Sequence, residues 1–128
     1  MNILDESIIK SQRRQLEAWR VHFRTIGRDI GRFGMKDIDE ILPLLHSLTY
    51  PTFFTMDDDF YHPTLLHAGY CLAYLDVYPD EAADYTRRFL RHRAFRTQSQ
   101  RMGTVVRIRQ SGINSWQVGT AKIRDLKW

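Results

Sequence analysis

One stretch of the chain, from Tyr70 to Leu75, restricts the possible folds more than any other feature. Its side chains are apolar or aromatic throughout, so an extended strand here would present no charged group on either face. Strands of this kind occur in parallel sheets, where helices cover both faces. The stretch therefore predicts a central strand of a sheet that is flanked by helices.

Candidate strands and helices alternate along the rest of the chain. Strands are predicted at 2–4, 21–26, 51–55 and 104–109, with a return strand at 113–118. Helices are predicted at 7–22, 37–48 and 79–91, with a short irregular one at 60–67. This alternation predicts an α/β fold with a mainly parallel sheet. Because the sequence contains neither a repeat nor a Gly/Ser/Pro-rich linker, residues 1–128 are expected to form one domain.

Aspartates follow the predicted strands in a pattern that indicates a metal site. Asp5 follows the first strand, the run Asp57–Asp59 follows the strand at 51–55, and Asp76 follows the central strand. The carboxyl ends of parallel strands meet at one edge of the sheet, where ligands bind. Gathered carboxylates repel one another unless protons or a cation neutralise them, and oxygen ligands suit Mg²⁺ or Mn²⁺. The pattern predicts a divalent-metal site held by Asp5, Asp57 and Asp59.

Helix capping is the alternative explanation for each aspartate. Asp is favoured at the N-cap, so Asp5, Asp37 and Asp57 could each cap a helix that follows. Asp37 and Glu40 also have the spacing of a capping box. The coincidence of Asp5 with the acidic run at 57–59 is what favours the metal site.

Charge is distributed unevenly along this chain of net charge +4. Residues 1–86 carry 8 Lys/Arg and 14 Asp/Glu, whereas residues 87–128 carry 11 Lys/Arg and one acid, Asp125. Such a basic segment predicts contacts with nucleic-acid phosphates, and Phe95 and Trp116 could stack on bases. The alternative is a solvated basic surface with Phe95 in the core. The predicted contacts are Arg87, Arg88, Arg91, Arg93, Arg96, Arg101 and Arg107, with Arg109 further along the same strand.

Other features narrow the class of protein. Cys71 is the only cysteine, so an internal disulfide is excluded, and we expect a buried, unreactive thiol in a reducing cytoplasm. No signal peptide or apolar run of membrane-spanning length is present, so no membrane association is expected. The histidines lack the spacing of a zinc site, and the glycines between 27 and 34 lack that of a phosphate-binding loop.

Three segments together resemble a known family. Residues 3–7 read Ile-Leu-Asp-Glu-Ser, residues 34–41 read Gly-Met-Lys-Asp-Ile-Asp-Glu-Ile, and residues 52–60 read Thr-Phe-Phe-Thr-Met-Asp-Asp-Asp-Phe. In order and spacing they resemble the Leu-Asp-Glu-Asn start, the Gly-x-x-Asp-x-x-x-Ile helix start and the Thr-x-Asp-x-Asp-Phe motif of the PIN-like proteins of the DUF5615 and Mut7-C type. Ser7 and Met56 depart from the pattern, which often has Asn and a basic residue there.

The resemblance implies a three-layer α/β/α PIN-like fold and metal-site roles for Asp5, Asp37, Asp57 and Asp59. Many PIN domains are Mg²⁺- or Mn²⁺-dependent ribonucleases, and many are toxins of bacterial toxin–antitoxin pairs. The resemblance therefore implies an endoribonuclease with RNA as substrate and an antitoxin protein as partner.

Three alternatives stay open at this point. The chain could be an inactive PIN-like module that binds a protein or a nucleic acid. A phosphatase with Asp5 as nucleophile has less support, because its usual Asp-x-Asp pair would need an acid at Ser7. A homodimer is also expected if the strand region at 104–118 is exposed and pairs between subunits.

Overall fold

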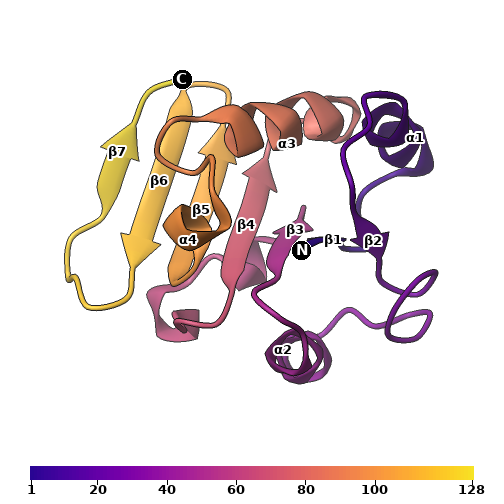
Figure 1. The fold of residues 1–128 in the computed structure, drawn as a ribbon, viewed down its shortest axis with the longest axis horizontal. Coiled ribbons are helices and arrows are strands. Elements are labelled where there is room, and N and C mark those ends of the chain that lie inside the picture. Colours follow the sequence, from indigo (N-terminus) through magenta and orange to yellow (C-terminus); the bar gives the residue numbers. More distant parts are fainter.

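The computed structural model describes every residue from Met1 to Trp128 and contains one seven-stranded sheet (Figure 1). The strands lie in the order β2-β1-β3-β4-β5-β6-β7. The first five are parallel: β1 (Asn2–Leu4), β2 (Arg24–Thr25), β3 (Thr52–Thr55), β4 (Cys71–Asp76) and β5 (Thr104–Arg109). Two antiparallel strands complete the sheet: β6 (Gly112–Gln117) and β7 (Arg124–Leu126). The predicted α/β class with a mainly parallel sheet is confirmed.

Four α-helices and three 3₁₀ turns connect the strands. The helices are α1 (Lys10–Ala18), α2 (Ile38–Ser47), α3 (Ala82–Arg91) and α4 (Gln98–Arg101). The 3₁₀ turns are η1 (Asp58–Phe60), η2 (Pro63–Leu65) and η3 (Pro79–Glu81). The predicted helix at 7–22 is too long, because Ile9 is extended and Arg20 adopts a left-handed φ of 59°. The irregular helix expected at 60–67 consists instead of separate 3₁₀ turns.

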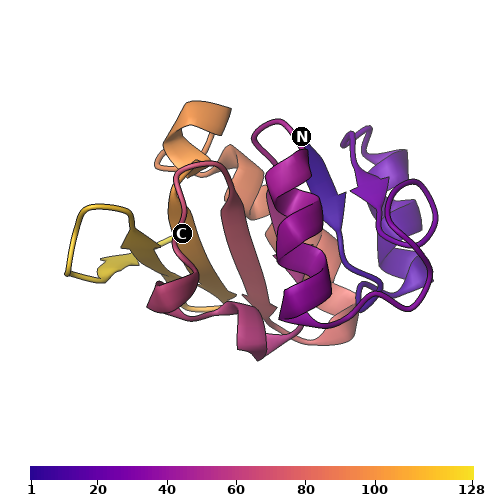
Figure 2. The same cartoon turned by 90° about the horizontal axis from the view of Figure 1, so that it is seen from below.

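The sheet carries an apolar core on each face, as the alternating side chains of its strands require. On one face, Leu16 of α1 and Phe89 of α3 pack with Phe54 of β3. On the other face, Ile41 of α2 packs with Phe53 of β3. Figure 2 shows α2 on the near side of the sheet and α3 behind it. Helices therefore cover both faces, and none of them combines the length and apolar character needed to cross a membrane.

The central strand is buried as the sequence predicted. Residues Cys71, Leu72 and Ala73 of β4 have no exposed surface. Burial raises the pKa of the Cys71 thiol to about 12, although the hydroxyl of Thr104 donates a hydrogen bond to its sulfur at 3.3 Å. Cys71 is therefore a packing residue, as expected.

The C-terminal residues form a strand that sequence patterns did not predict. β7 pairs with β6 in register, with Asn114 opposite Asp125. As a result β6 lies between β5 and β7 and is not a sheet edge. The premise of the homodimer expectation, that the strand region at 104–118 is exposed for pairing, is therefore wrong. The true edges, β2 and β7, have two and three residues, and short edges of this kind resist pairing with other chains.

The fold predicts a large difference between two phenylalanine truncations. Phe89 is fully buried, with its ring centroid 5.9 Å from that of Phe54, whereas Phe33 is 87% exposed. We expect Phe89→Ala to lower the free energy of unfolding by about 3–5 kcal/mol. Phe33→Ala should change it by less than about 0.5 kcal/mol. Urea denaturation followed by circular dichroism would measure both, and equal effects would contradict this assignment of the core.

Candidate functional site

Asp5 lies at the carboxyl edge of the sheet, directly after β1. Its backbone N–H donates to the carbonyl oxygen of Phe54 at 2.9 Å, so the chain is still paired with β3 at this residue. The register of β1 and β3 places Leu4 beside Phe54 and therefore Asp5 beside Thr55. Only 6% of Asp5 is exposed. Asp5 does not cap α1, because that helix begins at Lys10 and its N-cap is Ile9.

Three donors hold the Asp5 carboxylate in place. The hydroxyls of Ser7 and Thr55 each donate to its Oδ2 at 2.8 Å. The backbone N–H of Glu6 donates to its Oδ1 at 2.9 Å. A carboxylate with this many donors has little rotational freedom, so the orientation of Asp5 is set by the protein.

The same two hydroxyls connect Asp5 to the loop that follows β3. Thr55 Oγ1 accepts from the backbone N–H of Asp57 at 3.0 Å, and Ser7 Oγ accepts from that of Met56 at 3.1 Å. Sequence reasoning treated Ser7 only as a departure from a motif and gave Thr55 no role. Their one sequence signal was a hydroxyl residue close to each strand-end aspartate.

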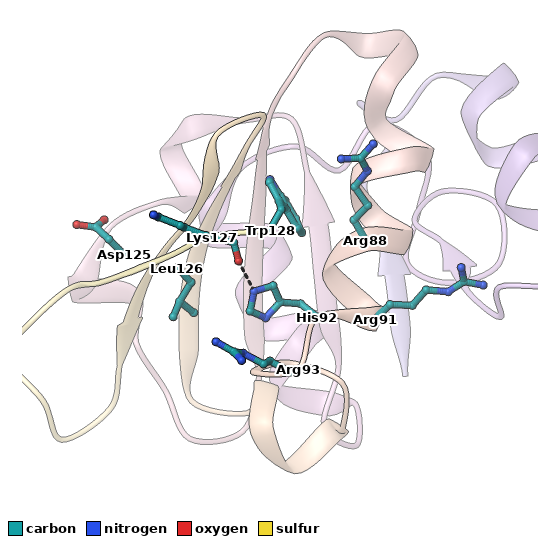
Figure 3. Close-up of a pocket in the computed structure, with 8 residues that line it drawn as sticks. All are labelled: Arg88, Arg91, His92, Arg93, Asp125, Leu126, Lys127 and Trp128. Atoms are coloured by element: carbon teal, nitrogen blue, oxygen red, sulfur yellow. Dashed lines mark hydrogen bonds between the residues drawn. The ribbon is translucent and has the colours of Figure 1, made fainter.

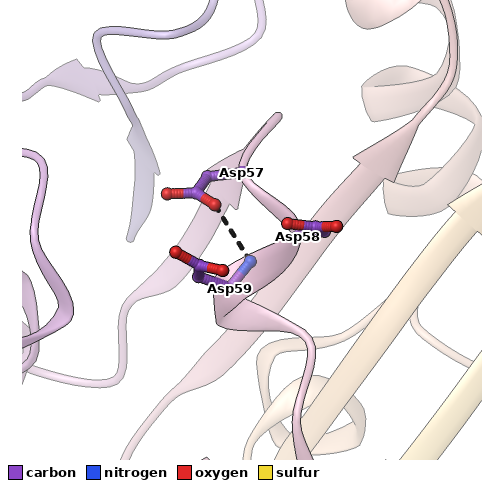
Figure 4. Close-up of side chains that lie close together, drawn as sticks. All are labelled: Asp57, Asp58 and Asp59. Atoms are coloured by element: carbon purple, nitrogen blue, oxygen red, sulfur yellow. Dashed lines mark hydrogen bonds between the residues drawn. The ribbon is translucent and has the colours of Figure 1, made fainter.

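The acidic run after β3 forms a compact cluster (Figure 4). One carboxylate oxygen from each of Asp57, Asp58 and Asp59 lies within 4.8 Å of the others. Asp57 is half-buried, while Asp58 and Asp59 are exposed. The Oδ1 of Asp57 accepts from the backbone N–H of Asp59 at 2.9 Å and so caps η1, which leaves its Oδ2 without a partner. The cluster includes Asp58, which was not among the predicted ligands.

The electrostatic environment of Asp5 disfavours its charged form. Burial raises its pKa above the ordinary value, and the negative charge of Asp57 raises it further. The hydrogen bonds from Thr55, Ser7 and Glu6 oppose this shift without cancelling it. Any cation held beside Asp57 would favour ionised Asp5, because an opposite charge lowers the pKa of a carboxyl group.

The donor atoms at this edge fit a hard divalent cation. All are carboxylate or hydroxyl oxygens, which suit Mg²⁺ or Mn²⁺ better than softer transition metals. Asp57, Asp58 and Asp59 have the spacing to share one ion. Asp5 lies outside that close cluster, and protein donors occupy both of its oxygens. It is therefore placed to act beside the cluster rather than as an equivalent member.

Two other predicted acids are arranged differently. Asp76 forms an ion pair with Arg107, whose Nε lies 2.9 Å from Asp76 Oδ2. Asp37 is the N-cap residue of α2, but its exposed side chain makes no capping hydrogen bond. Asp37 follows Gly34 by three residues, and the Gly34 N–H donates to Glu6 at 2.8 Å. The segment before α2 is thus tied to the loop after β1, and α2 covers the face of Asp5, but Asp37 itself lies outside the close acidic cluster.

Two residues of the predicted nucleic-acid surface lie in the interior. Arg101 is 8% exposed and donates to Thr52 Oγ1 at 3.0 Å and to the carbonyl oxygen of Phe95 at 2.9 Å. Its desolvation lowers the pKa of the guanidinium. Phe95 itself is fully buried. The prediction that Arg101 contacts nucleic acid and that Phe95 stacks on bases is therefore wrong, because both residues stabilise the core.

The remaining arginines are divided between the two faces of the sheet. Arg88, Arg91 and Arg93 line a groove of about 890 Å³ together with residues 125–128 (Figure 3). Leu126 of this groove packs against the core beneath α1 and α3, whereas Asp5 and Thr55 lie on the face that α2 covers. Arg87 stacks on Trp19, with its guanidinium carbon 3.6 Å from the ring centroid, and Arg96 is exposed. Arg107 lies on the α2 face.

Comparison of the chain with protein-family models, with curated proteins and with solved structures gave no match.

The raised pKa of Asp5 predicts a pH-dependent effect of Asp5→Asn. The neutral form of Asp5 stabilises the fold at pH values below its unfolded pKa, about 3.9. That contribution is lost as the pH rises through the higher folded pKa. Asp5→Asn should therefore melt at a higher temperature than the unaltered protein at pH 8, and the difference should shrink towards pH 4. Thermal melts across this range, with Asp80→Asn as an exposed control, would measure it. The expectation fails if the melting temperature of Asp5→Asn, relative to that of the unaltered protein, is lower at pH 8 than at pH 4.

The hydrogen bond from Thr55 predicts a further shift in the pKa of Asp5. In Thr55→Val the donor to Asp5 is lost, so the pKa of Asp5 should rise further. The N–H of Asp57 also loses its acceptor, and we expect about 1–3 kcal/mol of destabilisation. Carbon-detected NMR titration of the Asp5 carboxyl group would measure the pKa. Thr120→Val, in an exposed turn, is the matched control and should leave the pKa of Asp5 unchanged.

Proposed function

We propose that this protein is a Mg²⁺- or Mn²⁺-dependent ribonuclease with a three-layer PIN-like fold. One observation carries the proposal: three carboxylates gather at the carboxyl edge of a parallel sheet, next to a buried aspartate held by hydroxyls. That edge is where open α/β sheets bind their ligands. Helices on both faces of the sheet agree with the layered arrangement of a PIN domain.

Asp57, Asp58 and Asp59 would hold the cation, with Asp5 beside them and Asp37 further along the same edge. When bound, such a cation polarises a phosphoryl oxygen and lowers the pKa of a coordinated water. Thr55 and Ser7 keep Asp5 oriented towards the loop that carries Asp57. The hydrogen bond from Asp59 to Asp57 fixes the first residue of the cluster.

RNA would be held partly by the basic groove on the other face of the sheet. Arg91, Arg93 and Lys127 line that groove and form no ion pair with an acid. Unpaired cations of this kind bind phosphates without regard to sequence. The groove would hold parts of the RNA that lie away from the cleaved bond.

A second candidate is an inactive PIN-like module that binds a protein partner, such as an antitoxin. It is favoured by the Asp5 hydrogen bonds, because the donors from Glu6, Ser7 and Thr55 satisfy the carboxylate without a cation. The two candidates differ in Mn²⁺ affinity, which only the ribonuclease requires.

The ribonuclease proposal predicts that Asp57→Asn abolishes metal-dependent cleavage. Mn²⁺ with the unaltered protein should cleave labelled single-stranded RNA, and EDTA should stop it. Asp57→Asn should lower the cleavage rate by at least about 100-fold, because a ligand to the cation is lost. Asp80→Asn, purified identically, removes an exposed acid elsewhere and should cleave at the normal rate. Calorimetry should show weaker Mn²⁺ binding by Asp57→Asn alone. Mn²⁺-loaded protein that cleaves no RNA of varied sequence would contradict the proposal.

A further inference from the structure

A row of polar side chains crosses the sheet on the α2 face and begins at Asp5. The strand register places Thr55 beside Tyr74, Tyr74 beside Arg107, and Arg107 beside Asn114. Asp5 extends the row on the other side of Thr55, to which it is hydrogen-bonded. Neighbouring strands are about 4.8 Å apart, so the backbone of Arg107 lies about 14 Å from that of Asp5. The row therefore joins the candidate metal edge to the middle of the sheet.

Aromatic rings flank this row. Tyr61, just after η1, has its ring centroid 6.3 Å from that of Tyr74, with the planes inclined by 32°. Trp116 of β6 lies opposite Val105 and so projects from the same face. All three rings are half-buried, so each keeps part of its surface in contact with solvent. Partly exposed rings beside one another on a sheet can stack on unpaired bases.

Two arginines on β5 project from the same face. Arg107 is held by Asp76, through contacts of 2.9 Å from Nε and 2.5 Å from Nη2 to the same oxygen. Arg109 forms no ion pair, and its buried Nε lacks a hydrogen-bond partner. It lines a hollow of about 450 Å³ at the strand ends, with Asp76, Tyr78 and Ser111. No acid engages its guanidinium, and an unpaired guanidinium is suited to bind a phosphate.

Most acids near these arginines are already engaged. Asp76 is paired with Arg107, and Asp125 accepts a hydrogen bond from Asn114. Asp58 belongs to the acidic cluster after β3 and forms no ion pair with Arg109. Arg109 is therefore the cation of this surface with no acid bound to it.

We propose that Tyr61, Tyr74, Arg107, Arg109 and Trp116, together called the aromatic–arginine strip, bind single-stranded RNA and lead it towards Asp5 and Asp57. The rings would stack on bases, while Arg109 binds a phosphate and Asp76 holds Arg107 in position. A single strand is required, because paired bases have no free face for stacking. The inference rests on the proposed function for the identity of the substrate, but binding requires neither metal nor cleavage.

The aromatic–arginine strip differs from the basic groove in its relation to the carboxylates. The groove lies on the face that α1 and α3 cover, so RNA held there alone does not pass Asp5. The strip lies on the face of Asp5 and in register with it. Substitutions on the two faces can therefore distinguish the two surfaces.

Fluorescence anisotropy with a labelled single-stranded RNA of about ten nucleotides, in EDTA to prevent cleavage, tests the proposal. Arg109→Gln should weaken binding by about 10-fold, because a charged contact with phosphate is lost. Trp116→Leu should weaken it by about 5- to 10-fold, and Trp116→Phe, which keeps a ring, should restore most of the affinity. Arg14→Gln, at an exposed position of α1 outside both surfaces, is the matched control and should change the affinity by less than about twofold, whereas Arg93→Gln tests the basic groove.

A second measurement needs no variant. Photo-crosslinking of the unaltered protein to RNA containing 4-thiouridine, followed by peptide mass spectrometry, should label the peptides that contain Tyr74 or Trp116. Labelling confined to residues 88–93 would overturn the proposal.

The outcomes separate this inference from the proposed function. Three results would overturn the proposal that the strip binds RNA. They are normal binding by both Arg109→Gln and Trp116→Leu, loss of binding in Arg93→Gln alone, and absence of RNA binding by the unaltered protein. Binding that depends on the strip without any Mn²⁺-dependent cleavage would support the strip and refute the ribonuclease. Mn²⁺-dependent cleavage with an unchanged KM in Arg109→Gln would support the ribonuclease and refute the strip.

Discussion

Burial of both faces of the parallel sheet is the constraint on which the other features of this protein depend. Phe53 and Phe54 are adjacent in β3, and each is fully buried in a different core. Helices must therefore cross over on both sides of the sheet, and each crossover returns the chain to the amino ends of the strands. All carboxyl ends consequently meet at one edge. The acids that follow β1 and β3 are brought together by this topology, although about 50 residues separate them in the sequence.

At that edge, neutral hydroxyls rather than charges connect the two strands. Thr55 and Ser7 donate to Asp5 and accept from the backbone after β3, so each hydroxyl uses both of its hydrogen-bonding functions. A buried carboxylate would otherwise leave its oxygens unsatisfied, which is unfavourable in a medium of low dielectric constant. The donors make burial of Asp5 acceptable, yet its pKa is still raised. A carboxyl group whose orientation is fixed and whose charged form is disfavoured in this way is typical of a functional site.

The basic C-terminal third shows how a continuous run of charge in sequence is distributed by the fold. α3 carries the chain from the carboxyl edge back to the amino ends, where the N–H of Gly103 bonds to the carbonyl oxygen of Tyr70. Arg91 and Arg93 are thereby moved away from the acids, and Arg101 is buried at the amino end of β3, where it bonds to Thr52. β5 then returns to the carboxyl edge with Arg107 and Arg109 on the face of Asp5. One basic segment thus supplies two separate surfaces and one structural residue.

The sequence by itself determined the α/β class, the bounds of β5, the burial of the central strand and the placement of acids after β1 and β3. Those properties follow from short-range patterns, such as alternating side chains and apolar runs that end in Asp. Only the tertiary structure decided that Arg101 is internal, that β7 covers β6, and that Ser7 and Thr55 hold Asp5. It also decided which face each arginine occupies. These properties depend on strand register and on the direction of each crossover, which are set by contacts between residues far apart in the chain.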